Sequence, residues 1–220
     1  MITIAAFSDS HGTLPPIEKH VDVVCIAGDI SPLRLQTYNE SMKNWFCTEF
    51  LEWCDKVPTD LILLVPGNHD FFFEYVIDNS IKSFIESVGL SNKVKILIDE
   101  SCVYKDKIFY GCPWCQSPRG WAFISTKYYK DIPKCDVLIC HQPPAIEKVG
   151  WSYPDSPWER NFSSEELAER ILEINPRIVF CGHIHTGQAY AKDNDTEIYN
   201  VSLLDEEYVK FKDVTWTSLE

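Results

Sequence analysis

The sequence predicts an α/β fold in which buried strands alternate with helices. Five short runs of Ile, Val, Leu and other apolar residues each end abruptly in polar residues, and helix-like segments separate some of them. Runs of this length, bounded by Gly or Pro, are typical of strands that are buried on both faces. Ligands of layered α/β proteins gather beyond the carboxyl ends of the strands, and the five polar clusters occupy that position.

The predicted elements follow in chain order. The five strands are expected at Ile2 to Phe7, Val21 to Ala27, Leu61 to Val65, Val137 to Cys140 and Ile178 to Cys181. The helices are expected at Leu35 to Trp53, Glu74 to Val88 and Ser163 to Ile174. Ser163 precedes Glu166 by three residues, which is the spacing of a capping box at a helix start.

A second group of strands is expected further along the chain. Its members are Lys93 to Ile98, Cys102 to Tyr104, Ile108 to Tyr110 and Glu197 to Val201. The segment Lys105 to Lys107 separates the middle two, which predicts a hairpin there.

Length and composition favour one globular domain over residues 1–220. The chain has 220 residues, 45% of them hydrophobic, which suffices for one sizeable core. No basic segment precedes the first apolar run, and no apolar stretch approaches the length of a membrane span. Nine cysteines are an odd number for a complete set of disulfides, and Cys25, Cys140 and Cys181 lie in the apolar runs. We therefore expect a cytoplasmic protein without a membrane partner.

The charge of the chain restricts its partners. A formal charge of −13 disfavours long nucleic acid, because such binding depends mostly on Lys and Arg that neutralise phosphates. Bound divalent cations would reverse the local sign, so a small phosphorylated substrate remains the expected partner. Nothing in the sequence indicates the oligomeric state.

Histidine, carboxylate and amide side chains follow the five predicted strands. They are Asp9 with His11, Asp29, Asn68 with His69 and Asp70, His141, and His183 with His185. Residues two apart project to the same side of an extended chain, so the Asp-x-His and His-x-His pairs could each face a metal ion. A mixture of imidazole and carboxylate groups is typical of a catalytic transition-metal site.

Each of these motifs also has an ordinary explanation. A single Asp-x-His or His-x-His is more often a turn or a solvated pair than a metal site. Glycines beside the motifs, at Gly12, Gly28, Gly67 and Gly182, are common in loops. The six histidines are nevertheless grouped: four lie in the strand-end clusters, His69 lies beside them, and only His20 lies outside. This grouping favours a metal site.

The same residues resemble a known family. In order and spacing, the motifs around Asp9, Asp29, Asn68, His141 and His183 are similar to the five-part signature of the calcineurin-like metallophosphoesterases. The match extends over residues 9–185 and is highly specific, because five separated motifs must agree.

A closer resemblance is to the metallophosphoesterase domain-containing branch of that family. It is carried by Pro66 to Asp70, Leu97 to Glu100, Tyr110 to Trp114, Asp136 to Ile139, His141 to Pro144 and Pro176-Arg177. Gln142 departs from the glycine expected at its position, which concerns the local loop shape and the substrate fit but not metal binding.

The resemblance implies a fold, a metal centre and roles for individual residues. The fold would be a four-layer α/β/β/α sandwich. One ion would be held by Asp9, His11 and His185, the other by Asn68, His141 and His183, and Asp29 would bridge them. Two divalent ions are expected, with Mn²⁺ favoured over Fe, Ni or Zn. His69 would protonate the leaving group, with Asp70 fixing its tautomer; the alternative is a structural loop histidine.

Other motifs suggest competing functions. Cys112 and Cys115 form a C-x-x-C, which could indicate a thioredoxin-like redox site, although it follows a predicted hairpin instead of opening a helix. Aromatic residues that could stack on a nucleobase are Phe71, Phe72, Phe73, Trp114, Trp121, Trp151, Tyr153 and Trp158. Most are expected in the core. Phe71 and Trp114 are the favoured substrate contacts, and Arg119 could contact a phosphate.

We therefore predict a dinuclear metal-dependent phosphoester hydrolase. A small phosphodiester such as a cyclic nucleotide is the favoured substrate class, because the closer resemblance is to a phosphodiesterase-like branch. The alternatives are a phosphomonoesterase or protein phosphatase, a nuclease, and a binding or scaffold protein with an inactive site.

Overall fold

Two β-sheets lie face to face at the centre of the computed structural model, which describes residues 1–37, 39–75, 83, 85–87, 89–90, 92–116 and 119–220. The first sheet has five strands, in the order β13 (Thr215–Leu219), β1 (Ile2–Phe7), β2 (Val21–Ala27), β3 (Thr59–Val65) and β4 (Val94–Ile96). The second has six, in the order β11 (Tyr190–Asp193), β12 (Thr196–Asn200), β10 (Ile178–Cys181), β7 (Val137–Cys140), β6 (Lys107–Cys112) and β5 (Glu100–Tyr104).

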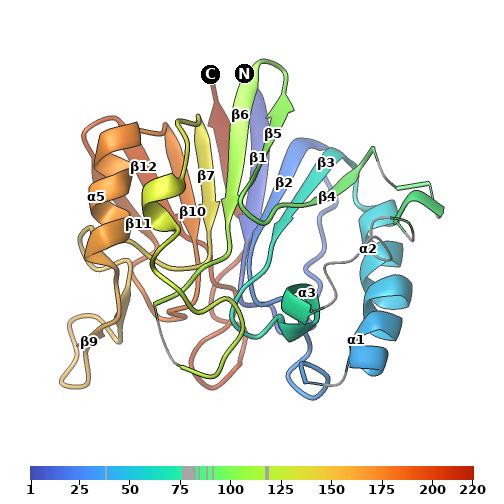
Figure 1. Ribbon diagram of the computed structural model, residues 1–220, viewed down its shortest axis with the longest axis horizontal. Coiled ribbons are helices and arrows are strands. Elements are labelled where there is room, and N and C mark those ends of the chain that lie inside the picture. Colours follow the sequence, from blue (N-terminus) through green and yellow to red (C-terminus); the bar gives the residue numbers. More distant parts are fainter. Residues whose placement is uncertain (38, 76–82, 84, 88, 91, 117–118) are drawn as a thin grey trace.

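Helices cover the outer faces of both sheets (Figure 1). The helical run on the first sheet consists of α1 (Asn39–Trp45), the π-helical η1 (Phe46–Phe50) and α2 (Leu51–Lys56), and α3 (Phe71–Tyr75) lies near its end. The second sheet is covered by α5 (Glu165–Ile174) and the short 3₁₀ helix η2 (Tyr129–Asp131). This arrangement confirms the predicted four-layer α/β/β/α sandwich.

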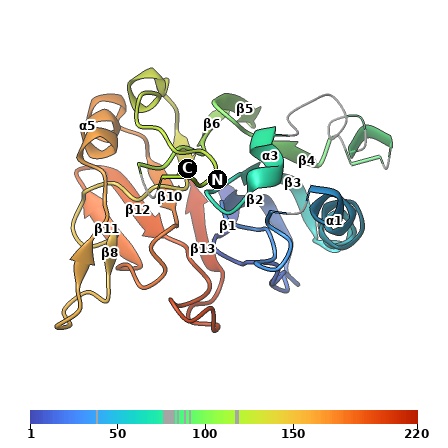
Figure 2. The ribbon, with the colours of Figure 1, turned by 60° about the horizontal axis from the view of Figure 1, so that its bottom comes forward.

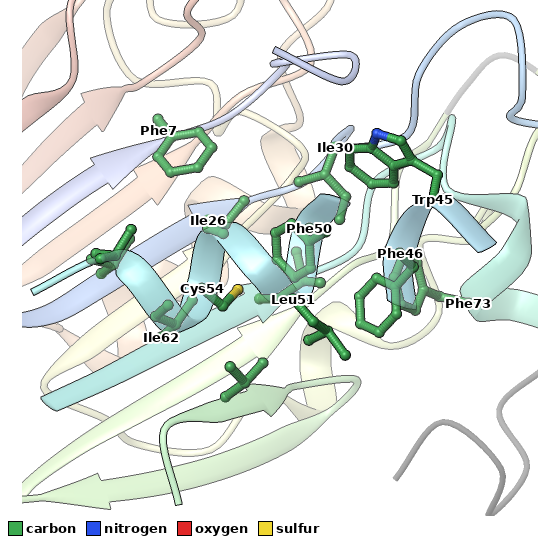
Figure 3. Close-up of a cluster of buried hydrophobic side chains, with 14 of the residues drawn as sticks. Phe7, Ile26, Ile30, Trp45, Phe46, Phe50, Leu51, Cys54, Ile62 and Phe73 are labelled. Atoms are coloured by element: carbon green, nitrogen blue, oxygen red, sulfur yellow. The ribbon is translucent and has the colours of Figure 1, made fainter. Parts of the chain in front are cut away.

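The sandwich has three hydrophobic cores, one between the sheets and one between each sheet and its helices. They form because successive side chains of a strand point to opposite faces of the sheet. Ile4 and Ala6 of β1 face the second sheet, whereas Ala5 and Phe7 face the helices. Both faces of these strands are thus buried, which is why their sequences are continuously apolar. In Figure 3 the helical residues Phe46, Phe50 and Leu51 pack with Ile26 and Ile62 of the first sheet.

All five predicted strands form, and β1, β2, β7 and β10 have the predicted bounds. The prediction was wrong about β4, which we grouped with the later strands: it pairs in parallel with β3 and closes the first sheet. The predicted hairpin is confirmed as β5 and β6, with Lys105 and Asp106 both at positive φ in its turn. The strand predicted from Glu197 is β12 of the second sheet.

One helix prediction needs correction, and another falls partly on residues that are not described. The first helical run begins at Asn39, not Leu35, and extends to Lys56. Part of the helix predicted over Glu74 to Val88 lies outside the described residues.

The predicted capping box at Ser163 is wrong by one residue. Ser164 caps α5, since its hydroxyl accepts a hydrogen bond from the Leu167 amide at 3.3 Å. Ser163 is unavailable, because both its amide and its hydroxyl donate to Asn161.

The fold places the carboxyl ends of the parallel strands at one edge of the molecule, opposite the two termini in Figure 1. A two-stranded arm, β8 (Trp151–Ser152) and β9 (Arg160–Asn161), projects at the same edge. Figure 2 shows the arm and the loop that precedes β13 on one side of the sheets. Within the described residues, no helix combines the length and the apolar character needed to cross a membrane.

Candidate metal centre

The structure brings together the side chains predicted as metal ligands. Asp9, His11, Asp29 and Asn68 follow strands of the first sheet, and His141, His183 and His185 follow strands of the second. Several sets of three potential ligand atoms lie within 4.8 Å of one another, among them Asp9 with His11 and His185, and Asp9 with Asp29 and His141. Donors from both sheets therefore converge on one place.

The backbone reaches this place by left-handed turns. Asp9, His11, Asp29 and His183 have φ values of 51°, 43°, 55° and 68°, so the extended geometry assumed for the Asp-x-His and His-x-His pairs was wrong. Such conformations are uncommon outside glycine and persist where surrounding contacts enforce them. Backbone hydrogen bonds from the Asp9 amide to the Gly28 carbonyl and from the His11 amide to the Asp29 carbonyl, both 3.0 Å, hold the turns.

Asp9 anchors the first group of donors. Its carboxylate accepts hydrogen bonds from the Ser202 hydroxyl at 2.8 Å and from the His183 amide at 3.1 Å, which fixes it between the two sheets. The His185 Nε2 atom lies 3.4 Å from Asp9. On the other side of the ring, Nδ1 donates to the Asp205 carbonyl at 2.7 Å, so Nε2 is the atom directed at the centre.

His141 and Asp29 form the second group. His141 Nδ1 donates to the Ala27 carbonyl at 2.8 Å, which directs Nε2 to Asn68 Oδ1 at 3.0 Å and to Asp29 Oδ2 at 3.2 Å. Asp29 belongs to two of the possible ligand sets, one with Asp9 and His141 and one with His11 and His69. This shared position is what a bridging carboxylate requires.

Burial divides the histidines into two kinds. Burial lowers the pKa of His11 and of His183 to about 4, so both are neutral and keep a lone pair for a ligand. Burial also opposes protonation of His141 and His185, but the carboxylates of Asp29 and Asp9 raise their pKa values to about 9. The neighbouring imidazoles in turn keep the carboxylates of Asp9 and Asp29 ionised.

The unpaired ring of His11 indicates that these donors fit a metal ion. Both of its ring nitrogens are buried and have no hydrogen-bond partner among the described residues, and the Ser10 hydroxyl has none there either. An unpaired buried imidazole is costly unless something else occupies its lone pair. Together with two carboxylates and further neutral nitrogen donors, this is the donor chemistry of a divalent transition metal.

Two glycines give the centre its shape. A Cβ atom on Gly67 would collide with Asp29 Oδ1 and come within 2.7 Å of His141 Nε2. A Cβ on Gly28 would collide with His141 Nδ1, and its φ of 97° also favours glycine. The backbone thus approaches the centre closely at both positions.

Comparison with known proteins decides the family. The family model described as calcineurin-like phosphoesterase matches residues 2–187. The chain belongs to the calcineurin-like phosphoesterase family. Metallophosphoesterases of this family use a dinuclear divalent metal centre, and the Asp and His clusters described above could hold such ions.

Relatives within the family are longer than this chain. Metallophosphoesterase domain-containing protein 1 of Homo sapiens and that of Mus musculus are each 26% identical to it over 221 residues. The match covers 89% of this chain but 64% of each relative, so the chain spans slightly less than two thirds of their length.

Solved structures show the same fold at low identity. Phosphopantetheinyl Hydrolase (PptH) from Mycobacterium tuberculosis matches with a TM-score of 0.52 at 16% identity, over 94% of this chain and 90% of that one. TT1561 of Thermus thermophilus matches with a TM-score of 0.52 at 15% identity, over 91% and 88% of the two chains. At these identities the likeness concerns the fold alone.

His69 lies beside the calcineurin-like centre, but Asp70 does not hold its ring. The Asp70 carboxylate accepts hydrogen bonds from the amides of Asp29, Ser31 and Gly67 at 2.8–2.9 Å, so its oxygens brace the loop that carries Asp29. The ring of His69 is held instead by Gln36, whose Oε1 lies 2.6 Å from Nδ1. The predicted orienting role of Asp70 is therefore corrected to Gln36, which no local sequence signal identifies.

Tyr208 is a second residue that the sequence did not identify. Its ring packs edge-on against His11 and His185, with ring centroids 4.9 and 5.5 Å apart, and its φ is 61°. It comes from the loop before β13, far along the chain from the family motifs.

The C-x-x-C does not have the properties of a redox site. Cys112 and Cys115 are both buried, and burial raises the pKa of each thiol well above its ordinary value, whereas redox cysteines are exposed and acidic. The Cys115 sulfur instead lies within 4.8 Å of potential ligand atoms of His141 and His183.

A cavity lies beside His183, and none of the three predicted substrate contacts lines it. The Nε1 of Trp114 donates to Asp99 at 2.6 Å, and its ring stacks on Tyr128. Phe71 packs against Trp121, whose ring centroid lies 4.3 Å from that of His69. Arg119 is exposed.

Proposed function

We propose that this chain is a dinuclear metal-dependent phosphoester hydrolase that acts on small phosphodiesters such as cyclic nucleotides. The observation that carries the proposal is the convergence of buried carboxylates and neutral imidazoles from both sheets, with the His11 nitrogens left unpaired. Family membership supports phosphoester hydrolysis. The preference for a diester rests on the closer resemblance of the sequence and on the charge of the chain.

The proposed ligands divide between two sites. Asp9, His11 and His185 would hold one divalent ion, Asn68, His141 and His183 the other, and Asp29 would bridge them. Bound there, the pair of ions would supply Lewis-acid polarisation of the phosphoryl oxygens and activation of a water molecule. Mn²⁺ is the favoured ion, with Fe, Ni and Zn as alternatives.

His69 is proposed as the general acid. Its Nδ1 faces Gln36, so Nε2 is the nitrogen free to exchange a proton, 3.9 Å from Asp29 Oδ2. Burial lowers the pKa of His69, which makes the protonated ring a readier donor to a departing oxygen. Asp70 supports this chemistry indirectly, because it fixes the loop that carries Asp29.

We also propose that the substrate is small and that the protein works in a reducing compartment. The charge of −13 opposes long nucleic acid. The nine cysteines are free, and most are buried, as expected for a cytoplasmic protein.

One experiment tests this function. The purified protein is loaded with Mn²⁺, Fe²⁺, Ni²⁺ or Zn²⁺, and turnover of bis(p-nitrophenyl) phosphate is compared with that of p-nitrophenyl phosphate, with Asp29→Ala as the control. We expect metal-dependent turnover of the diester that Asp29→Ala abolishes. Activity on the monoester alone would overturn the diesterase preference. No metal binding and no turnover with any ion would favour a binding protein.

A further inference from the structure

A cavity of about 760 Å³ adjoins the metal centre on the side of His183. His183 and Ile184 of the last motif form part of its lining. The rest comes from the β8–β9 arm and from Glu206 and Glu207, which carry none of the family motifs. Figure 2 shows the arm and this loop on the same side of the molecule. A volume of this size matches a small-molecule site and is larger than a phosphate group needs.

Aromatic side chains are exposed in this cavity. Trp158 is 73% exposed, and Tyr153 and Phe162 are more than a third exposed, although all three are large hydrophobic residues. The other large aromatics of the chain serve mainly in the cores, where packing explains them. Packing does not explain three exposed rings that line one cavity beside a reaction centre, whereas stacking on a flat ligand does.

The charges of the cavity are arranged to select among ligands. Arg160 makes no ion pair with any described residue, so its guanidinium is available to stack on a flat group or to donate hydrogen bonds. Glu206 and Glu207 add two carboxylates to the lining. These carboxylates disfavour further phosphates but can accept hydrogen bonds from the amino groups of a base.

Hydrogen bonds hold the arm against the metal centre, and ion pairs brace the arm itself. The Tyr153 amide donates to the Thr186 hydroxyl at 2.8 Å, and that hydroxyl donates to Glu206 at 3.1 Å. Thr186 directly follows His185, so the cavity wall is tied to the ligand loop. At the other end of the arm, Lys148 Nζ pairs with Asp155 at 2.6 Å and with Glu159 at 3.0 Å.

We propose that this cavity binds a planar aromatic group of the substrate, of the nucleobase class, that carries no phosphate besides the one being hydrolysed. The inference rests on the proposed function and specifies its substrate. Trp158, Tyr153 and Phe162 stack on the ring, and Arg160 contacts its edge or face. The carboxylates of Glu206 and Glu207 exclude nucleoside polyphosphates and nucleic acid.

Three esters with one leaving group test the proposal. Methyl p-nitrophenyl phosphate, thymidine 5′-(p-nitrophenyl phosphate) and p-nitrophenylphosphorylcholine release the same p-nitrophenolate, so differences in kcat/KM report the other substituent. We expect the thymidine ester to exceed the methyl ester about tenfold, since base stacking on an aromatic side chain is of that strength. Trp158→Leu should reduce this ratio several-fold.

Trp216→Leu is the matched control, because Trp216 is 49% exposed but lies on β13, outside the cavity. It should leave the ratio unchanged. Equal kcat/KM for the methyl and thymidine esters would overturn the proposal, and so would a preference for the choline ester, which would indicate a cationic ligand.

A failure of the proposed function can be distinguished from a failure of this inference. If none of the esters is hydrolysed, the hydrolase proposal fails, and binding of adenosine is then measured by quenching of tryptophan fluorescence. Saturable quenching that Trp158→Leu weakens and Trp216→Leu does not would support the aromatic subsite. Its absence would overturn it. Equal melting temperatures of the variants and the wild type exclude a folding defect.

Discussion

His69 differs from the other histidines of the centre because its Nδ1 is engaged by a side-chain amide, whereas its Nε2 makes no hydrogen bond with a described residue and lies 3.9 Å from Asp29. We expect His69→Ala to retain its metal, measured by elemental analysis, but to lose roughly 10²–10⁴ in kcat toward diesters with poor leaving groups, because general acid catalysis contributes about that much. His20→Ala is the control, since His20 is exposed and, within the described part of the chain, pairs only with Asp60. Full activity of His69→Ala would refute its role as the acid.

Gln36 gives a second prediction at the scale of the residue. Replacement by Leu removes the partner of His69 Nδ1 and frees the ring to rotate, so kcat should fall about tenfold, as for other groups that orient a functional imidazole. In the Gln36→Leu/His69→Ala double variant, kcat should be no lower than in His69→Ala alone, because Gln36 acts only through the His69 ring. An additive loss would show that Gln36 acts elsewhere.

At the scale of the element, α5 tests which serine caps the helix. Ser164→Ala should lower the free energy of unfolding by about 1 kcal/mol, because the Leu167 amide loses its acceptor. Ser163→Ala is the matched control and should change the stability by less than about 0.5 kcal/mol, since its hydroxyl donates to the exposed Asn161 of β9. Urea denaturation measures both, and a larger cost at Ser163 would restore the predicted capping box.

The β5–β6 hairpin is tied to the first sheet by Asp22 of β2. Its carboxylate accepts hydrogen bonds from the Thr3 amide and hydroxyl at 2.8 and 2.7 Å and pairs with Lys105 in the hairpin turn. The ammonium of Lys105, and then the Thr3 amide, hold the pKa of Asp22 well below its ordinary value. The carboxylate therefore stabilises the fold above about pH 4, and the effect fades as the pH falls below that value.

Asp22→Asn should accordingly lower the free energy of unfolding by about 1 kcal/mol at pH 7. This value is smaller than that of a buried charged hydrogen bond, because Asp22 lies close to solvent. The difference from the wild type should shrink at pH 3, as followed by urea denaturation at both pH values. Asp106→Asn is the matched control in the same turn, because Asp106 is exposed and Asn also tolerates positive φ. A difference that does not depend on pH would contradict the assignment.

At the scale of the whole molecule, the proposed ions would join the two sheets. Asp9, Asp29 and Asn68 extend from the first sheet, and the three ligand histidines other than His11 extend from the second. An ion that binds only the folded chain at 100 times its dissociation constant stabilises it by about 2.7 kcal/mol. For a chain of this size, the melting temperature should rise by about 5–10 °C.

Differential scanning fluorimetry with Mn²⁺ against EDTA measures this shift. Asp29→Ala should abolish most of it, because Asp29 belongs to both groups of donors. An equal shift in Asp29→Ala would place the stabilising ion elsewhere.

The bounds of β1, β2, β7 and β10 and the chemistry of their ends could be predicted from the sequence alone. Strands such as Ile2–Phe7 and Ile178–Cys181 are buried on both faces, so their apolar runs are continuous and end where the chain leaves the core. The residue types that follow these strands, such as Asp9 and His183, then indicated a metal site.

Only the tertiary structure decided how these parts meet. The assignment of β4 to the first sheet, the left-handed turns at Asp9 and His183, and the pairing of His69 with Gln36 depend on contacts between distant segments, which local patterns do not encode. The position of the arm that brings Trp158 to the cavity likewise depends on contacts between distant segments. Hydrophobic periodicity records whether a residue is buried, but the partner of each buried or polar group is set by long-range packing.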